Sequence, residues 1–340
     1  MFGGSGMGVK LSPLVRFRAV SLRELEGSRV AVDASNVLFQ FLSKIRRGGL
    51  PLFNHEGRVV SHVYGVFYRT VNLMERGIRP IYVFDGSHPA LKGRREHLVE
   101  SLVREYGYLK KARMKGDYLV ARTLSLSPEV LYDTVTGETQ QLLTLMGVPW
   151  IRAPGEGEAQ AAHMTRTGKA DHVLTQDYDA LLFGARSVLR NLNFTTNSAE
   201  CATLEEILGE AGISHEQLVD LAILVGTDFN PGVKGIGVRR GLKLIKKHGD
   251  IFGVLSELGL EPHGVEGVRR VFLSPSVVDP QILFNAPNVD SLRRFLEGFG
   301  MKRERIDRGV GRLVRAYKAS RLMQATLHGD SSLECLKEKV

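Results

Sequence analysis

A short apolar run near the start of the chain, Arg29-Val30-Ala31-Val32-Asp33, ends abruptly in an aspartate. The same design recurs in Ile81-Tyr82-Val83-Phe84-Asp85 and in His172-Val173-Leu174-Thr175-Gln176-Asp177. Apolar runs of this length are typical of strands buried on both faces, as in a parallel sheet covered by helices. Helical patterns fill the intervals at 36–44, 60–76 and 128–146. We therefore predict an α/β fold with a mostly parallel central sheet flanked by helices.

Seven acidic residues stand among small or apolar neighbours instead of in charged surface runs: Asp33, Asp85, Glu156, Glu158, Asp177, Asp179 and Asp228. Three of them end the predicted strands, and they are expected to converge because ligands of α/β sheets bind beyond the carboxyl ends of the strands. Taken singly, each acid could be a helix cap or a turn residue. Gathered together, they would raise one another's pKa unless cations are present. Oxygen ligands without His or Cys select Mg2+ or Mn2+ over zinc, and two such ions can stabilise both reacting oxygens of a phosphoryl transfer.

Two pairs of these acids are spaced two positions apart, so whether both members of a pair can reach one site depends on the local backbone conformation. Glu156 and Glu158 precede an Ala-rich helix, and residues two apart on a helix do not share a face. Both can serve one site only if Glu156 lies in the loop or first turn, which the preceding Pro154-Gly155 favours. Asp177 and Asp179 follow the third strand, and their side chains would point the same way if the backbone stays extended.

The composition is that of a globular protein with a basic surplus. The 340 residues are 43% hydrophobic and 24% charged, which excludes collagen, coiled coil and wholesale disorder. The 46 Lys and Arg against 37 Asp and Glu give a net charge of +9, which favours nucleic acid or an acidic membrane surface as partner. Cys201 and Cys335 support neither a disulfide framework nor a zinc site. We expect no membrane span and no signal peptide, and hence an intracellular protein without a membrane partner.

Two basic segments are candidates for nucleic-acid binding. Residues 88–127 combine Lys and Arg with tyrosines, which is typical of a solvated helical hairpin or of a channel where bases stack on rings and phosphates meet cations. Lys234-Gly235-Ile236-Gly237 lies between helices predicted at 214–225 and 238–247, the first of which opens on a capping-box signature. Glycines there let the backbone approach a phosphate closely. The alternative is an ordinary helix-helix turn with a solvated basic face. Another basic helix is expected at 302–321.

Six motifs occur in order and together make the chain similar to the flap endonucleases of the structure-specific 5′-nuclease superfamily, particularly the archaeal and eukaryotic form. They are Val32-Asp33-Ala34-Ser35-Asn36, Tyr82-Val83-Phe84-Asp85-Gly86, Gly155-Glu156-Gly157-Glu158-Ala159-Gln160-Ala161-Ala162, Gln176-Asp177-Tyr178-Asp179-Ala180-Leu181-Leu182-Phe183-Gly184, Gly226-Thr227-Asp228-Phe229-Asn230-Pro231-Gly232 and Lys234-Gly235-Ile236-Gly237. The likeness runs from about residue 7 to residue 321. It implies an α/β nuclease domain with a helical arch and a helix-two-turn-helix element that binds DNA.

The resemblance also implies a domain plan. A single nuclease domain would span residues 8–325, between a flexible leader at 1–7 and a flexible tail at 326–340. Its parts would be an N-terminal nuclease region at 8–105, an arch at about 88–127, an internal nuclease region at about 128–260 and a C-terminal helical region at 261–325.

The family implied by the motifs cuts 5′ single-stranded flaps at their junction with duplex DNA, using two Mg2+ ions, in DNA replication and repair. We expect the same hydrolysis here, with 5′-3′ exonuclease activity as well and with Mn2+ able to replace Mg2+. A relative that prefers bubbles is one alternative, and a catalytically silent DNA-junction-binding protein is another. The expected location is the cytoplasm or nucleoid of a prokaryote, or the nucleus of a eukaryote.

Carried over to this chain, the resemblance implies metal ligands at Asp85, Glu156, Glu158, Asp177, Asp179 and Asp228. Asp33 would act on the metal directly or through water. Lys92 matches the arch lysine that contacts the scissile phosphate, and Phe39 stands where relatives carry a tyrosine that stacks on a base. Gly8 matches the residue after the initiator Met. The expected DNA contacts are Gly8, Phe39, Arg46, Arg69, Lys92, Lys234, Gly235, Gly237, Arg239 and Arg240.

Besides Phe39 and the leader ahead of Gly8, the chain departs from the family pattern at two further places. Relatives carry an arginine several residues after the arch lysine, where this chain has Glu96-His97-Leu98-Val99, so the second arch cation is unassigned. Relatives also often end in a motif that binds the sliding clamp. Gln324 and Leu327 fit that motif, but Asp330 and Ser331 stand at its aromatic positions, so a clamp partner is an open expectation.

Overall fold

A seven-stranded sheet forms the centre of the protein, in a computed structural model that describes residues 11–47, 50–86 and 128–327. The strand order is β1-β9-β8-β7-β2-β5-β6. Neighbouring strands from β8 to β6 are parallel, whereas β9 pairs antiparallel with both β8 and β1. The strands are β1 Arg18–Ser21, β2 Arg29–Asp33, β5 Arg79–Phe84, β6 Trp150–Arg152, β7 His172–Leu174, β8 Ser187–Asn193 and β9 Ser198–Thr203. The predicted mostly parallel α/β sheet is therefore confirmed.

The apolar runs become central strands because both faces of the sheet are covered. Successive side chains of a strand point to opposite faces. In β2, Val30 and Val32 enter one hydrophobic core while Ala31 enters the other. In β5, Tyr82 belongs to the first core and Ile81 to the second. A strand with one polar face could not serve in this position.

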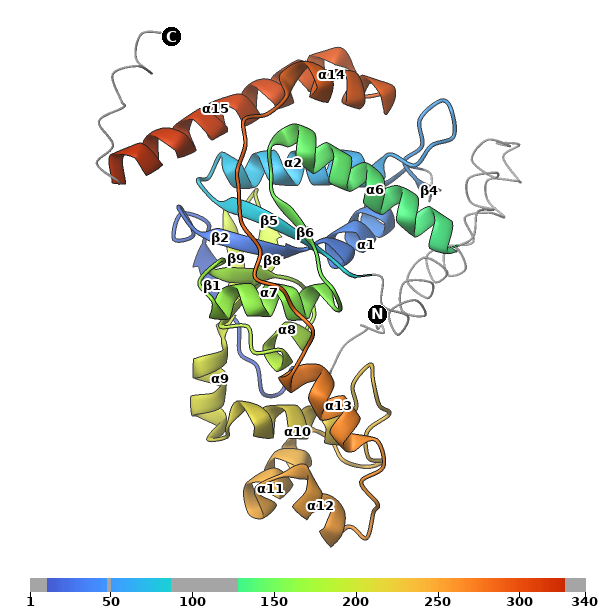
Figure 1. Cartoon of the computed structure of the whole chain (residues 1–340), viewed down its shortest axis with the longest axis vertical. Helices are drawn as coiled ribbons and strands as arrows, with labels where there is room; N and C mark the ends of the chain where they lie inside the picture. Colours follow the sequence, from blue (N-terminus) through green and yellow to red (C-terminus); the bar gives the residue numbers. More distant parts are fainter. Residues whose placement is uncertain (1–10, 48–49, 87–127, 328–340) are drawn as a thin grey trace.

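Helices pack on both faces of the sheet (Figure 1). Those on one face are α1 Ala34–Lys44, α2 Ser61–Met74, α6 Pro128–Met146, α14 Val289–Gly298 and α15 Arg303–Leu327. Those toward the other face are α7 Gly157–Arg166, α8 Asp179–Leu182, α9 Leu204–Ala211, α10 His215–Val225, α11 Val238–His248, α12 Ile251–Glu257 and α13 Val265–Leu273. A small ribbon of β3 Arg46–Arg47 and β4 Leu50–Pro51 follows α1. Among the described helices, none has the length and apolar character needed to cross a membrane.

Local capping fixes where the helices begin. The Asp33 carboxylate accepts a hydrogen bond from the backbone N–H of Asn36, so α1 begins at Ala34, directly after β2 and two residues before the predicted range. The predicted capping box at the start of α10 is confirmed, with Ser214 and Gln217 exchanging side-chain and backbone hydrogen bonds. The helix predicted at 128–146 has the bounds of α6.

Several boundaries differ from prediction. Strand β7 ends at Leu174, not at Asp177, and β5 begins two residues earlier than expected. Helix α15 continues to Leu327, beyond the predicted end at residue 321. The strands β1, β8 and β9, which form the two antiparallel pairs of the sheet, carry mixed polar sequences and were not predicted. The leader at 1–7 and the arch at 88–127 lie outside the described residues.

An extended segment, residues 275–288, connects α13 to α14 and runs across the front of the molecule in Figure 1. Gln160 of α7 exchanges two hydrogen bonds with the backbone of Val278. Further along, the N–H of Asn285 donates to the carbonyl of Gly147 at 2.9 Å. This segment therefore joins the helices on the two faces of the sheet.

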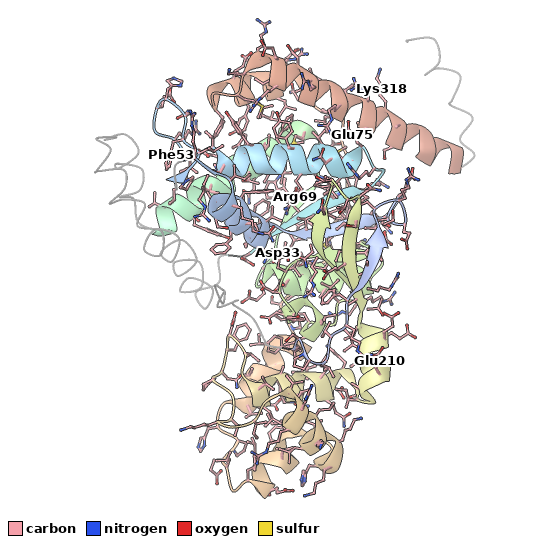
Figure 2. All side chains as sticks on the ribbon, turned by 180° about the vertical axis from the view of Figure 1, so that it is seen from behind. Asp33, Phe53, Arg69, Glu75, Glu210 and Lys318 are labelled. Carbon is pink, nitrogen blue, oxygen red and sulfur yellow. The ribbon has the colours of Figure 1, made fainter. Side chains whose placement is uncertain are left out.

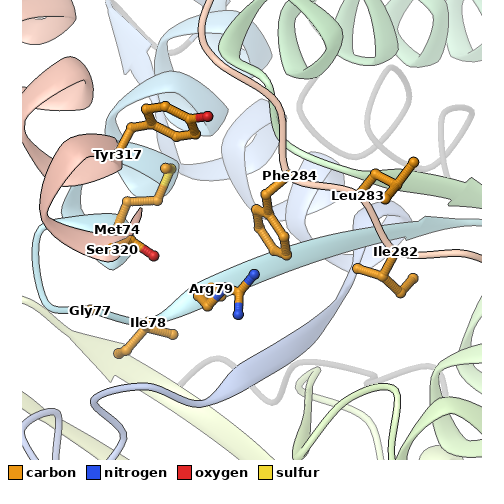
Figure 3. A pocket seen from close by; sticks show the side chains of 9 residues that line it. All are labelled: Met74, Gly77, Ile78, Arg79, Ile282, Leu283, Phe284, Tyr317 and Ser320. Carbon is orange, nitrogen blue, oxygen red and sulfur yellow. The ribbon is translucent and has the colours of Figure 1, made fainter. Parts of the chain in front are cut away.

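A pocket of about 230 Å³ opens between this segment, the end of α2 and helix α15 (Figure 3). The Arg79 guanidinium lies 4.4 Å from the centre of the Phe284 ring, at the amino end of β5. The pocket is therefore at the end of the strand opposite to Asp85.

Candidate active site

Three acidic side chains meet at the carboxyl ends of the central strands. Asp33 is the last residue of β2, Asp177 follows β7, and Glu158 lies in the first turn of α7. Each offers one carboxylate oxygen, and these oxygens lie within 4.8 Å of one another. Asp33, labelled near the middle of the molecule in Figure 2, is only 5% exposed. We call these three residues the acidic cluster.

Asp85 lies beside the acidic cluster and is held by two hydrogen bonds. The N–H of Gly157 donates to its Oδ1 at 2.7 Å, and the hydroxyl of Ser35 donates to its Oδ2 at 2.6 Å. The Ser35 hydroxyl also lies 2.9 Å from the Tyr132 hydroxyl on α6. A Cβ at position 157 would lie 2.9 Å from the carboxylate, so only glycine lets α7 approach this closely. The carboxylate thus faces the amino end of α7, where negative charge is favoured.

Thr175 connects all three members of the acidic cluster. Its hydroxyl is the hydrogen-bond donor to two carboxylates, at 3.2 Å from Oδ2 of Asp33 and 3.0 Å from Oε1 of Glu158. The same oxygen accepts a hydrogen bond from the backbone N–H of Asp177 at 3.3 Å. Thr175 is buried, so these contacts are shielded from competing water.

The electrostatics of the acidic cluster favour a bound cation. Burial, together with the charges of Asp85 and Asp177, raises the pKa of Asp33 to about 8 against the opposing hydrogen bonds from Asn36 and Thr175. Without a cation, Asp33 therefore retains a proton at neutral pH. The donors are carboxylate oxygens without His or Cys, a set that fits a hard ion such as Mg2+ or Mn2+.

The backbone conformation expected at Glu156 and Glu158 is found, whereas the one expected at Asp177 and Asp179 is not. Glu156 is the extended N-cap residue of α7, so it lies before the helix as required for sharing a site with Glu158. The extended backbone assumed between Asp177 and Asp179 is wrong. Tyr178 adopts a helical conformation and Asp179 begins α8, where it is 1% exposed. The two aspartates are therefore related by a helical turn and not by strand alternation.

The side chain of Tyr178 is fixed by the Arg190 guanidinium and by the Phe17 ring. The Arg190 guanidinium donates to the Tyr178 hydroxyl at 3.1 Å and to Glu200 at 2.7 Å. It also lies 3.6 Å from the centre of the Phe17 ring. These contacts fix the turn between Asp177 and Asp179 from the side of β8 and β9.

Asp228 lies in a turn after α10 and is exposed. The Thr227 hydroxyl accepts from the N–H of Phe229 and donates to the Asn230 side chain. Gly232 has a φ of +74°, and a Cβ there would lie 2.5 Å from the Val225 carbonyl oxygen. The turn is thus well defined, but within the described residues Asp228 is not part of the acidic cluster.

The expected DNA contacts lie in several places. Lys234, Gly235, Gly237, Arg239 and Arg240 are exposed at the start of α11, and Arg46 is exposed in β3. Arg69 on α2 is half-buried and stacks 4.5 Å from the centre of the Phe41 ring. Phe39 packs against the core and is only partly buried. Gly8 and Lys92 lie outside the described residues.

Sequence reasoning assigned no role to the neutral groups around the acids. Ser35 and Asn36 stand in the first family motif and Thr175 lies in the third apolar run, but the acids that they contact in other segments are 17 to 142 positions away. Their position within three residues of the aspartates Asp33 and Asp177 was the one available signal.

Comparison with known proteins identifies the family of the chain. Residues 3–101 match the XPG N-terminal domain, and residues 147–228 match the XPG I-region, which contains all the predicted acids after Asp85. These matches define the class as the XPG superfamily of nucleases.

Curated relatives then define the family. Flap endonuclease 1 of Methanothermobacter thermautotrophicus is 47% identical over 311 residues, covering 88% of this chain and 94% of the relative. Flap endonuclease 1 of Aeropyrum pernix is 41% identical over 336 residues, covering 92% and 96%. The chain belongs to the flap endonuclease family, as its motifs predicted, and its activity class is that of a nuclease.

Solved structures support the same assignment. The flap endonuclease-1 from Methanococcus jannaschii superposes with a TM-score of 0.73 at 36% identity, covering 91% of this chain and 98% of that structure. The catalytic core of Rad2 in complex with DNA substrate superposes with a TM-score of 0.70 at 28% identity, covering 90% and 100%.

Proposed function

We propose that the protein hydrolyses DNA phosphodiester bonds at the junction of a 5′ single-stranded flap with duplex, and that two Mg2+ ions are required. The observation that carries this proposal is the acidic cluster, whose three carboxylates approach within 4.8 Å at the strand ends of a basic protein. Negative charge beside a phosphate backbone would oppose DNA binding unless cations lie between them.

Asp33, Glu158 and Asp177 are the residues best placed to hold a first ion, and Asp85 stands beside them. Glu156, Asp179 and Asp228 are proposed to complete the binding of the pair, and Mn2+ is expected to substitute. When bound, such ions supply a nucleophile at neutral pH and neutralise charge on the phosphate. The protein's own part is to orient the carboxylates through Thr175, Ser35 and Gly157.

DNA is proposed to bind along the exposed turn that precedes α11. Gly237 is the N-cap residue of this eleven-residue helix, and Lys234, Arg239 and Arg240 surround it. Backbone N–H groups at a helix start and neighbouring cations hold phosphates without reading base identity. Lys92 is proposed to contact the scissile phosphate, and residues 88–127 to admit the single-stranded end.

Cleavage of a labelled 5′ flap in Mg2+ tests the proposal. Asp177→Ala should abolish cleavage, whereas Glu210→Ala, which removes an exposed acid on α9 far from Asp33 (Figure 2), should cleave like the parent. Undiminished cleavage by Asp177→Ala would overturn the proposed chemistry. Tight flap binding without cleavage in Mg2+ would instead identify a silent junction binder. Parallel reactions on nicked and bubble substrates define the structural preference and the exonuclease activity.

Two further expectations stay predictions. A sliding clamp partner would need Gln324 and Leu327, with Asp330 and Ser331 outside the described residues. A role in DNA replication and repair would place the protein with the genome, in the nucleoid of a prokaryote or the nucleus of a eukaryote.

A further inference from the structure

A row of three hydrogen bonds runs from the acidic cluster to α2. The Asn36 side-chain amide donates from Nδ2 to Oδ2 of Asp177 at 3.1 Å. Gln40, one turn later on α1, donates from Nε2 to Oδ1 of Asn36 at 2.8 Å. Arg69 donates from Nη2 to Oε1 of Gln40 at 3.3 Å. We call this row the amide relay.

The two ends of the amide relay determine its direction. A guanidinium can only donate hydrogen bonds, and an ionised carboxylate can only accept them. Arg69 therefore requires the oxygen of Gln40, which leaves the Gln40 NH2 group to face Asn36. Asn36 must then turn its own oxygen toward Gln40, and its NH2 group faces Asp177. If Arg69 were absent, only the Asp177 carboxylate would fix this direction, and the Gln40 amide would lose the donor that holds its oxygen.

The amide relay lies on the wall of an open pocket. Asn36, Gln40 and Arg69 line a pocket of about 360 Å³, together with Lys44 and Thr175. Arg69 is half-buried, and its guanidinium is fixed over the Phe41 ring at 4.5 Å. Figure 2 shows Arg69 on α2 in the same region of the molecule as Asp33. The first turn of α1 thus contacts both Asp33, through the Asn36 backbone, and Asp177, through the Asn36 side chain.

We infer that Asn36 and Gln40 are positioning residues for Asp177 and that Arg69, through them, strengthens divalent-cation binding at the acidic cluster. This inference rests on the proposed function only in requiring that the cluster binds a cation. Groups that orient metal ligands from behind commonly change metal affinity by about 10- to 100-fold when removed.

The sign of the effect separates this inference from simple electrostatics. Removal of a positive charge near a cation site should strengthen cation binding by Coulomb's law. The amide relay predicts the reverse for Arg69→Met, because Gln40 loses an anchoring hydrogen bond and then holds Asn36, and through it Asp177, less firmly. For Gln40→Glu the two explanations again predict opposite changes in cation affinity. The added negative charge should strengthen cation binding, whereas the loss of the hydrogen bond that Gln40 donates to Asn36 should weaken it. Lys44→Met is the matched control, since it removes a cation of the same pocket that has no described contact with the relay.

The experiment is a titration of each purified full-length variant with Mn2+ in the absence of DNA, followed by electron paramagnetic resonance of the free ion. Arg69→Met and Gln40→Glu should bind Mn2+ about 3- to 10-fold more weakly than the parent, with Asn36→Ala weaker still. The Arg69→Met/Asn36→Ala double variant should bind no more weakly than Asn36→Ala alone. Lys44→Met should bind as tightly as the parent or more tightly. Thermal melting of the cation-free variants verifies that each is folded.

Equal or tighter Mn2+ binding by folded Arg69→Met and Gln40→Glu would overturn the inference while leaving the proposed function intact. Additive losses in the double variant would overturn the coupling through Asn36. A parent protein that binds no Mn2+ would overturn both the inference and the proposed metal site.

Discussion

At the scale of single residues, the site depends on neutral groups as much as on its acids. Asp33 is buried and carries a raised pKa, Asp85 is fixed by an amide and a hydroxyl, and one threonine touches the whole acidic cluster. The acids could be found in the sequence because each ends an apolar run or stands among small residues. Thr175 and Gln40 could not, because their roles arise only when segments far apart in the chain meet.

Thr175→Val tests the hydroxyl without changing the shape of the side chain. It removes the hydrogen bonds to Asp33, Glu158 and the Asp177 backbone, so we expect flap cleavage and Mn2+ affinity to fall about 10-fold. Thr175→Ser retains the hydroxyl and should restore most of both. A valine variant that cleaves the flap and binds Mn2+ like the parent would contradict the role assigned to the hydroxyl.

Asp33 should make the cation-free protein less stable as the pH rises. Its carboxyl group ionises near 3.8 in the unfolded chain and at about 8 in the folded one, so between these values only the folded state retains the proton. The stabilisation is fully present below about pH 4 and is lost as the pH rises toward 8. The free energy of unfolding should fall by up to about 1.4 kcal/mol per pH unit from this group.

Urea denaturation in a chelating buffer, at several pH values in that window, measures this slope. Asp33→Asn should flatten it and be more stable than the parent at the upper end. Parallel pH profiles for the two proteins would contradict the assignment, and added Mg2+ should stabilise the parent most where Asp33 is ionised.

At the scale of elements, the sequence predicted regular structure better than turns. The two apolar faces of β2 and the capping box of α10 are local patterns that survive in the fold. Tyr178 illustrates the failure: nothing in Gln176-Asp177-Tyr178-Asp179 distinguishes an extended segment from a helical turn. Arg190 and Phe17, which hold the tyrosine, come from other strands and loops. Boundaries near the site were thus set by tertiary contacts.

The turn that presents Asp228 depends on Gly232. Its φ of +74° and the 2.5 Å approach to Val225 leave no room for a Cβ, so Gly232→Ala should lower the free energy of unfolding by roughly 1 to 3 kcal/mol. Gly209→Ala is the matched control in α9, where the Cβ meets open space, and it should raise stability by up to about 1 kcal/mol. Denaturant titration of both variants gives the comparison, and a neutral Gly232→Ala would show that the turn can rearrange.

At the scale of the whole molecule, the acidic cluster and the basic turn before α11 are built from different elements. The acidic cluster sits where the central strands end, and the basic turn leads into α11, one of the lower helices in Figure 1. The strands β2 and β7 are neighbours in the sheet, which brings Asp33 at the end of β2 next to Thr175 and Asp177 after β7, although 142 positions separate Asp33 from Thr175. The net charge of +9 indicated a polyanionic partner but could not say where it binds.

DNA binding should be strongly salt-dependent, and α11 should supply part of that dependence. Arg239→Ala/Arg240→Ala is expected to weaken binding of a 5′ flap in chelator and to reduce the slope of log affinity against log salt by about 0.9 for each phosphate that these arginines neutralise. Its Mn2+ affinity should not change. Arg16→Ala, which removes an exposed cation beside Glu210, should leave the slope unaltered. The same slope in the double variant and the parent would remove α11 from the DNA interface.

The most direct measurement is anomalous diffraction from a crystal of the protein soaked in Mn2+. The account predicts an anomalous peak among the carboxylates of Asp33, Glu158 and Asp177, and its disappearance in Asp177→Ala. A well-ordered acidic cluster with no peak, or Mn2+ bound only at other acids, would contradict it.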